Sequence, residues 1–230
     1  IASFNSPVWF NVGVHEKPQA SACFILDVED DMESILEWFR QEGMIFKGGS
    51  GSGVNVSKLR AVGEPMSKGG FSSGPLSFMK AADAVAGSIK SGGTTRRAAK
   101  LVVMDVDHPD ILPFIKCKVE EEAKAHALLD AGFSNGLDGE AYGTVTYQNA
   151  NNSVSVPDAF LQAVQEDAEW GTWYRTTQSL AQTYKAKEIM RAIAQATWAC
   201  GDPGLFYYDA VNAWHTTPSR GSIRSGNPCQ

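Results

Sequence analysis

Cys229 is the residue of this sequence with the clearest potential for chemistry. It follows Pro228, whose ring fixes its own φ and keeps Asn227 in an extended or turn conformation, so the thiol lies on a defined turn. A cysteine in this setting is either a small buried hydrophobic residue or a positioned, reactive thiol. Packing is the more common role of a free cysteine, so a catalytic role needs support from other parts of the sequence.

The elements that must position this turn alternate between strands and helices. Short apolar runs predict strands, and apolar residues at helical spacing predict helices. The predicted strands are residues 5–14, 21–28, 101–105, 144–148, 170–175 and 205–208. The predicted helices are residues 31–43, 75–90, 110–131 and 183–200, with another that begins at Pro157. Asp30 or Asp31 is expected to cap the first helix and Gly43 to end it. This alternation predicts an α/β fold with a largely parallel sheet.

Two glycine-rich stretches could let the backbone approach a ligand closely. Residues 47–53 lack the Gly-Lys-Ser/Thr of a P-loop and the GxGxxG spacing of a dinucleotide site, and a flexible linker is the alternative interpretation. Residues 91–97 end in Arg96 and Arg97, a pair suited to a polyanion, although a solvated turn is the commoner role. Ligands of α/β sheets collect at the carboxyl ends of strands, so we expect both stretches and the terminal turn there.

Ser6 and His108 are weaker candidates for a site. Ser6 could cap a backbone turn or bind an anion, and the cap is the simpler interpretation. His108 has no partner histidine at metal-ligand spacing, so a turn or cap role is favoured over metal binding.

Composition and charge argue against several classes of function. The net charge of −6 over 230 residues disfavours a general nucleic-acid or membrane-surface binder, and no apolar run is long enough to span a membrane. The four cysteines, Cys23, Cys117, Cys200 and Cys229, show no CxxC spacing. This spacing disfavours a zinc site or a small disulfide framework and predicts a reducing, cytoplasmic setting.

Seven stretches, taken together and in order, carry a resemblance to a known family. They are Asn-Ser-Pro-Val-Trp-Phe-Asn (5–11), Ser-Ala-Cys (21–23), Gly-Gly-Ser-Gly-Ser-Gly (48–53), Ser-Gly-Gly-Thr-Thr-Arg-Arg-Ala-Ala-Lys (91–100), Gln-Asn-Ala-Asn (148–151), Cys-Gly-Asp-Pro-Gly (200–204) and Asn-Pro-Cys (227–229). With these stretches the chain resembles the catalytic (large, α) subunit of ribonucleotide reductase. The coenzyme B12-dependent class II enzymes are the most similar.

The resemblance implies a fold and an extent. The family's catalytic domain is an α/β barrel of ten strands, and this chain corresponds to its first half, a parallel five-stranded half-barrel with flanking helices. Residues 1–230 would then form a partial barrel domain that ends at the radical-cysteine loop. The family's glutamate two residues after that cysteine, and its second reducing cysteine, lie beyond Gln230. We therefore expect a fragment, a split-gene product or one half of a protein, inactive by itself.

The resemblance also implies residue roles at the catalytic site. Cys229 matches the cysteine that forms a thiyl radical and takes the 3′ hydrogen of the ribonucleotide. Asn227 matches the asparagine that hydrogen-bonds the ribose hydroxyls, and Cys23 matches one of two thiols that reduce the 2′ carbon and become a disulfide. The remaining substrate-binding positions are Ser6, near the phosphate end, and Ser21, Ala22 and Gly51.

A second site implied by the resemblance is allosteric. Asp30 and Arg60 match positions that bind a deoxynucleoside triphosphate effector, and Arg96 and Arg97 are assigned to the same site. The segment of residues 91–100 matches the one that carries the effector signal to the substrate base.

Cofactor and partners follow from the resemblance as well. Adenosylcobalamin is expected to generate the radical, with a separate metal-containing radical subunit, as in class I enzymes, as the alternative. A non-catalytic nucleotide-binding module is a third hypothesis. The expected partners are a ribonucleotide, the effector, the carboxyl-terminal half of the enzyme, a second copy in a homodimer and a thioredoxin-type reductant, but no membrane and no nucleic acid. Whether the substrate is a diphosphate or a triphosphate stays open.

Overall fold

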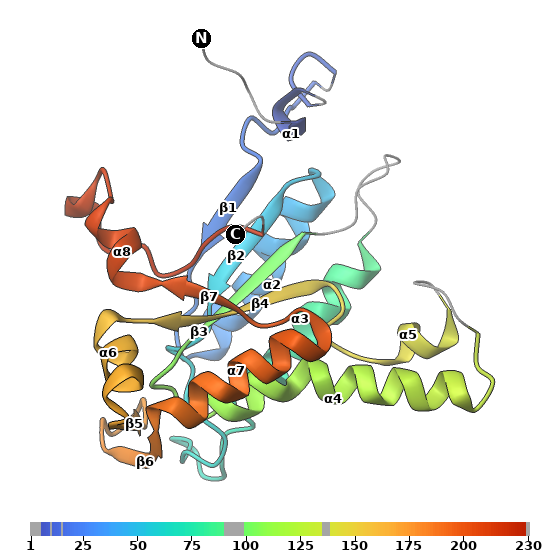
Figure 1. The fold of residues 1–230 in the computed structure, drawn as a ribbon. Coiled ribbons are helices and arrows are strands. Elements are labelled where there is room, and N and C mark those ends of the chain that lie inside the picture. Colours follow the sequence, from blue (N-terminus) through green and yellow to red (C-terminus); the bar gives the residue numbers. More distant parts are fainter. Residues whose placement is uncertain (1–5, 10, 15, 90–98, 135–138, 229–230) are drawn as a thin grey trace.

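A five-stranded parallel sheet is the centre of the computed structural model, which describes residues 6–9, 11–14, 16–89, 99–134 and 139–228. The strands are β1 (Cys23–Leu26), β2 (Gly51–Asn55), β3 (Lys100–Asp105), β4 (Ala150–Val156) and β7 (Gly204–Tyr207). They lie side by side in that order, and every neighbouring pair is parallel (Figure 1). The predicted parallel five-stranded half-barrel is confirmed; within the described residues the sheet does not close, because β1 and β7 are its two edges.

Helices join most of the neighbouring strands, because parallel strands need a crossover connection, and others precede β1 or follow β7. They are α1 (Ser6–Trp9), α2 (Met32–Lys47), α3 (Pro75–Ser88), α4 (Ile111–Asp130), α5 (Glu140–Thr144), α6 (Asp158–Glu166), α7 (Ala186–Cys200) and α8 (Tyr208–Ala213). A 3-10 turn covers Pro218–Arg220, and a separate antiparallel hairpin pairs β5 (Glu169–Trp173) with β6 (Leu180–Lys185). The predicted cap of the first helix is confirmed at Asp31, whose carboxylate accepts a hydrogen bond from Ser34 N at 2.9 Å.

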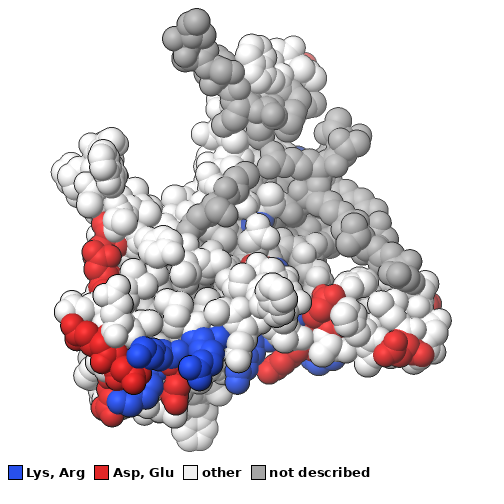
Figure 2. All heavy atoms as spheres, viewed as in Figure 1, with Lys and Arg blue, Asp and Glu red and all other residues white. Residues whose placement is uncertain are grey.

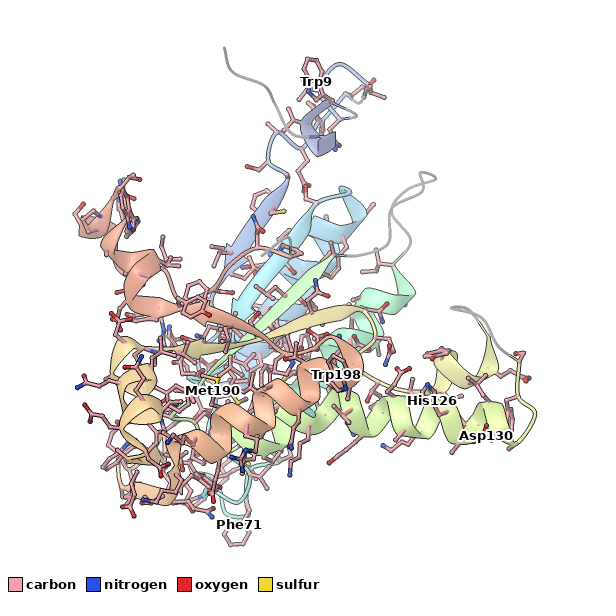
Figure 3. The ribbon with its side chains drawn as sticks, viewed as in Figure 1. Trp9, Phe71, His126, Asp130, Met190 and Trp198 are labelled. Atoms are coloured by element: carbon pink, nitrogen blue, oxygen red, sulfur yellow. The ribbon has the colours of Figure 1, made fainter. Side chains whose placement is uncertain are left out.

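One face of the sheet packs against the helices and forms the main core. Val54, Val102 and Val154 point to this side and pack with buried residues of the helices, among them Trp38 of α2 and Phe114 of α4. Trp198 on α7 and Phe71 after β2 point away into solvent, with 93% and 73% of their surfaces exposed (Figure 3). The main apolar core therefore lies on this side of the sheet.

The opposite face, called the inner face below, carries small and polar residues. Its residues follow from the strand registers: Cys23, Ile25, Gly51, Gly53, Asn55, Leu101, Val103, Asp105, Asn151, Ser153, Ser155, Gly204 and Phe206. Only a small apolar cluster, Leu101, Val103 and Phe206, lies among them. In Figure 2 most of the coloured charged side chains gather in the lower half, over the helices.

Several predicted element boundaries are wrong. Residues 5–14 include the helical turn α1 instead of a strand, and residues 144–148 end α5 and turn into β4, with Tyr147 at φ 64°. The first helix does not end at Gly43 but continues to Lys47, with Gly48 at its carboxyl cap. Of residues 47–53, taken as a glycine-rich loop, residues 51–53 begin strand β2, in which all five residues are buried. Strand β6 occupies residues 180–185, so the last long helix starts at Ala186.

Candidate active site on the inner face

The terminal segment, defined as residues 221–228, lies directly on the inner face of the sheet. A Cβ atom built on Gly53 would lie 1.9 Å from the carbonyl oxygen of Gly226, and one built on Gly51 would lie 2.6 Å from Cγ of Pro228. Ser225 is 1% exposed. The glycines of β2 are therefore required because the backbone of this chain's own terminal segment approaches the strand (Figure 1).

Polar side chains hold the start of the terminal segment. The Asn55 amide donates to Asp105 Oδ1 at 2.8 Å and to the carbonyl of Arg224 at 2.9 Å. The Arg224 guanidinium forms an ion pair with Asp105 Oδ2 at 2.9 Å. On α8, the Asn212 side chain binds both the N–H and the carbonyl of Ile223. A cavity of about 530 Å³ lies beside this ion pair.

The end of the terminal segment lies next to Cys23. The Asn151 amide donates to the carbonyl of Pro228 at 3.1 Å. Gly51, which Pro228 covers, is the register partner of Cys23 on the neighbouring strand. The structure thus brings Pro228 and Cys23 to the same end of the inner face, whereas Cys229 lies outside the described residues. Asn227 is exposed there.

This position corrects one expectation. The terminal turn was expected at the carboxyl ends of the strands, but Cys23 and Gly51 are the first residues of β1 and β2, so it lies at the amino ends. The physical reason is that the terminal segment starts beside Asp105, at the carboxyl ends of the strands. It then runs back across the inner face to the amino ends of β1 and β2.

The predicted substrate-binding residues fall into two groups. Ser21, Ala22 and Gly51 lie together at the amino ends of β1 and β2, where Ser50 Oγ donates to the Ser21 carbonyl at 2.6 Å and Gly51 N donates to the Ala22 carbonyl at 2.9 Å. Ser6 begins α1, which lies beyond the amino end of β1 in Figure 1. Three of the four positions therefore lie, like Cys23, at the amino ends of β1 and β2.

The predicted effector residues lie at the opposite ends of the strands, after the carboxyl ends of β1 and β2. Arg60 Nε contacts Asp30 Oδ2 at 2.6 Å, Arg60 N donates to Asp30 Oδ1 at 3.1 Å, and Arg60 also donates to the carbonyl of Pro65 at 2.9 Å. The two side chains are 24% and 26% exposed, so the guanidinium is partly open to solvent. Arg96 and Arg97 lie outside the described residues.

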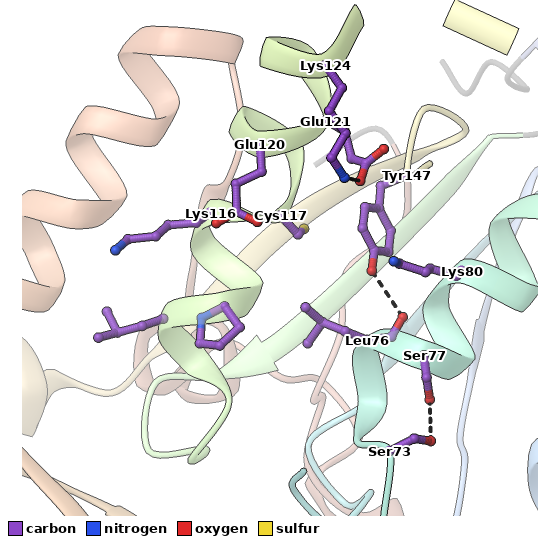
Figure 4. A pocket seen from close by; sticks show the side chains of 12 residues that line it. Ser73, Leu76, Ser77, Lys80, Lys116, Cys117, Glu120, Glu121, Lys124 and Tyr147 are labelled. Carbon is purple, nitrogen blue, oxygen red and sulfur yellow. Dashed lines mark hydrogen bonds and ion pairs between the residues drawn. The ribbon is translucent and has the colours of Figure 1, made fainter. Parts of the chain in front are cut away.

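Two other predicted residues have structural contacts. His108 is buried, with Nδ1 accepting from Asp110 N at 3.0 Å and Nε2 2.9 Å from the Leu59 carbonyl, so its predicted turn role is confirmed. Burial lowers the pKa of His108 to about 4. Cys117 lines a cavity of about 550 Å³ between α3 and α4, close to Tyr147 and Lys80 (Figure 4). Burial raises the pKa of Cys117 to about 12, so this thiol stays protonated at neutral pH.

Sequence reasoning missed Asn55, Asp105 and Arg224, which hold the terminal segment. A signal for the strand residues exists: buried parallel strands are usually continuous apolar runs, yet β2 and β4 carry Gly, Asn and Ser at alternate positions. Polar residues that alternate on a buried strand indicate a face that meets something other than a hydrophobic core.

The helices that the structure describes were compared with the length and apolar character of a membrane-spanning helix. None of them combines the length and the apolar character needed to cross a bilayer.

Comparison with known proteins identifies the family. Residues 21–230 match the family model described as ribonucleotide reductase, barrel domain. The chain is 58% identical over 229 residues to a vitamin B12-dependent ribonucleotide reductase of Streptomyces coelicolor, covering 100% of this chain and 24% of that protein. A relative of the same name from Rhodopirellula baltica is 44% identical over 257 residues, covering 99% of this chain and 25% of that protein.

A more distant relative has a more specific name. The vitamin B12-dependent ribonucleoside-diphosphate reductase of Mycobacterium tuberculosis is 34% identical over 226 residues, covering 98% of this chain and 29% of that protein. The chain thus spans about a quarter of the length of the relatives that it matches. The family match, the parallel half-barrel and the cysteine-bearing inner face agree, and the chain belongs to the ribonucleotide reductase family, within its barrel domain.

Proposed function

We propose that this chain provides part of the active site of an enzyme that reduces ribonucleotides to deoxyribonucleotides by thiyl-radical chemistry. The observation that carries the proposal is the convergence of Cys23 and the Asn227–Pro228 turn at one end of a polar sheet face. Two segments about 200 residues apart in sequence meet there, at the sites of the two family motifs that contain the proposed catalytic cysteines.

The proposed reaction assigns distinct tasks to the two cysteines. A thiyl radical at Cys229 takes the 3′ hydrogen of the ribose, and this activates the sugar to lose its 2′ hydroxyl as water. Two thiols then supply the two electrons and become a disulfide, and the 3′ hydrogen returns from Cys229. Cys23 is one of the reducing thiols; the second, and the catalytic glutamate, come from a part of the enzyme outside this chain.

The inner face has the polarity that a sugar requires. Asn227 is proposed to hydrogen-bond the ribose hydroxyls, and Ser21, Ala22 and Gly51 are proposed to line the substrate site at the amino ends of β1 and β2. Ser6 is proposed to lie near the phosphate. The helices exclude water from the other side of the sheet, and the remaining half of the barrel would cover the inner face and protect a radical from side reactions.

The cofactor proposal is adenosylcobalamin, because the relatives are named vitamin B12-dependent and their names favour it over a metal-containing radical subunit. When bound, this cofactor supplies the one-electron chemistry that makes the radical. Cys23 lines neither of the two cavities described above, and no residue of this chain is assigned a contact with the corrin ring. The roles proposed for this chain's residues therefore concern the substrate and the thiols alone.

An effector site at the carboxyl ends of β1 and β2, away from Cys23, is part of the proposal. Arg60, with Arg96 and Arg97, is proposed to bind the phosphates of a deoxynucleoside triphosphate, since a guanidinium can donate two parallel hydrogen bonds to a phosphate. Asp30 holds Arg60 in place at 2.6 Å. A second copy of the chain, a thioredoxin-type reductant and a reducing, cytoplasmic setting complete the proposed context, with residues 1–230 as a partial barrel domain.

The test uses a chimera in which this chain replaces the matching stretch of the Streptomyces coelicolor relative. We expect the chimera to convert ribonucleoside di- or triphosphates to deoxyribonucleotides only with adenosylcobalamin and a thiol reductant, and the 230-residue chain alone to be inactive. A chimera that binds a deoxynucleoside triphosphate without any turnover, while the parent enzyme is active, would favour a non-catalytic nucleotide-binding module instead.

A further inference from the structure

We propose that Asp105, together with Asn55 and Arg224, is a positioning device that fixes the register of the terminal segment along β2. The inference rests on the proposed role of Cys229, because the register decides where Pro228, the residue before it, lies relative to Cys23. No family motif noted in the sequence contains Asp105, Asn55 or Arg224.

The contacts between the terminal segment and β2 are regularly spaced. Arg224 is bound by Asn55, Gly226 contacts Gly53, and Pro228 covers Gly51. Each step of two residues along the segment thus matches a step of two residues back along β2. The terminal segment therefore lies extended and antiparallel to β2, stacked on its face.

Such a stack needs a device that prevents slippage. Extended chain rises about 3.3 Å per residue, so a slip of two residues would move Pro228 by about 6.6 Å along the sheet. The contacts of Gly226 and Pro228 consist of small groups on glycine, which do not distinguish one register from the next. The only charged contact between the segment and the sheet, within the described residues, is Arg224 with Asp105.

The side-chain amide of Asn55 and the carboxylate of Asp105 each use both of their polar atoms, which favours a single arrangement. Asn55 Oδ1 accepts from Ser57 N at 2.8 Å, and this orients the amide nitrogen toward Asp105 and the Arg224 carbonyl. Asp105 uses one oxygen for Asn55 and the other for Arg224, and its own N–H donates to Ser57 Oγ at 2.6 Å. Neither side chain can rotate without leaving a polar group unpaired.

Cysteine reactivity tests the positioning without relying on turnover. Asp105→Asn keeps the shape of the side chain but removes its charge, and Arg224→Gln removes the partner. The matched control is Arg220→Gln, since Arg220 precedes the terminal segment, is exposed and has no ion pair among the described residues. Alkylation of Cys229 in the 230-residue chain is followed by mass spectrometry, with buried Cys117 as the internal reference for a folded core.

We expect Asp105→Asn and Arg224→Gln each to change the Cys229 alkylation rate about fivefold, and the double variant to show no further change. Arg224→Lys, which keeps the charge, should have a rate close to that of the unsubstituted protein. In the chimera, kcat should fall about tenfold, while KM for the ribonucleotide stays within about twofold. Arg220→Gln should match the unsubstituted protein in both assays.

The positioning proposal is overturned if the Asp105 and Arg224 variants behave like Arg220→Gln while Cys117 stays protected. An inactive unsubstituted chimera would count against the proposed function instead, and the alkylation rates would then decide the positioning claim by themselves.

Discussion

Replacing Gly53 by alanine is a sharp perturbation of the contact between β2 and the terminal segment. Gly53 does not have a positive φ, so alanine can adopt its backbone conformation. The new Cβ would lie 1.9 Å from the Gly226 carbonyl oxygen, whereas ordinary contact begins at 3.4 Å. The terminal segment must therefore move away by about 1.5 Å, the difference between these distances.

Two opposing effects set the stability of Gly53→Ala. Removing a glycine from a strand is worth about 0.5–1 kcal/mol in favour of the folded state. Overpacking against a backbone carbonyl costs about 1–3 kcal/mol. The net loss of unfolding free energy should thus be no more than about 2.5 kcal/mol, and the protein should stay folded.

Turnover should respond much more strongly than stability. Because a misplacement of about 1 Å at a reacting group can cost about 100-fold, we expect the kcat of the Gly53→Ala chimera to fall about 100-fold. Gly51→Ala, with its Cβ 2.6 Å from Pro228 Cγ, should have a smaller effect. The control is Gly143→Ala in α5, where a Cβ meets nothing within 4 Å and kcat should be unchanged.

The assay combines thermal unfolding with steady-state kinetics of the chimera. A Gly53→Ala enzyme with kcat within twofold of the unsubstituted chimera would refute the reasoning. That result would mean that the terminal segment does not lie on β2 when the enzyme works.

Three further predictions concern the effector site and the core. Arg60→Ala should weaken deoxynucleoside triphosphate binding at least about tenfold and blur the choice among substrates, and an unchanged Kd by calorimetry would remove Arg60 from the site. Lys100→Met should lower the free energy of unfolding in urea by about 3–5 kcal/mol, because it leaves the buried carboxylate of Glu42 unpaired; a loss below 1 kcal/mol would contradict this. Because the pKa of His108 is about 4 in the folded chain and about 6.5 when unfolded, the unfolded chain binds the proton first as the pH falls. Stability should therefore decrease by about 3 kcal/mol between pH 6.5 and 4, and His108→Gln should remove most of this dependence.

The local pattern of the sequence predicts the apolar strands well. Residues 101–105 and 205–208 are short apolar runs, and both are strands within one residue of the prediction. The pattern fails for β2 and β4, whose Gly, Asn and Ser residues have low strand propensity. Those strands form because their neighbours supply ladder hydrogen bonds and because the inner face must be small and polar, which is a tertiary effect.

The candidate site was only partly predictable. The motifs around Cys23 and Asn227 are visible in the sequence, and the resemblance assigns their roles. The contacts of Asp105 with Asn55 and Arg224 join residues 50 and 119 positions apart, so no local pattern reveals them. The terminal turn was expected at the carboxyl ends of the strands, because the general rule for α/β sheets concerns loops that follow strands. It lies at the amino ends because the segment crosses the face of the sheet.

The most direct test of the central claim compares Cys229→Ser with Cys23→Ser in the chimera, by tracing the 3′ hydrogen of the substrate and the products formed. The account predicts that Cys229→Ser abolishes loss of isotope from a 3′-tritiated ribonucleotide, because a serine O–H bond is too strong to yield the radical. Cys23→Ser should still release the 3′ label but give free base or inactivated enzyme in place of deoxyribonucleotide. Normal deoxyribonucleotide formation by Cys229→Ser, or the same behaviour of both variants, would contradict the assigned roles.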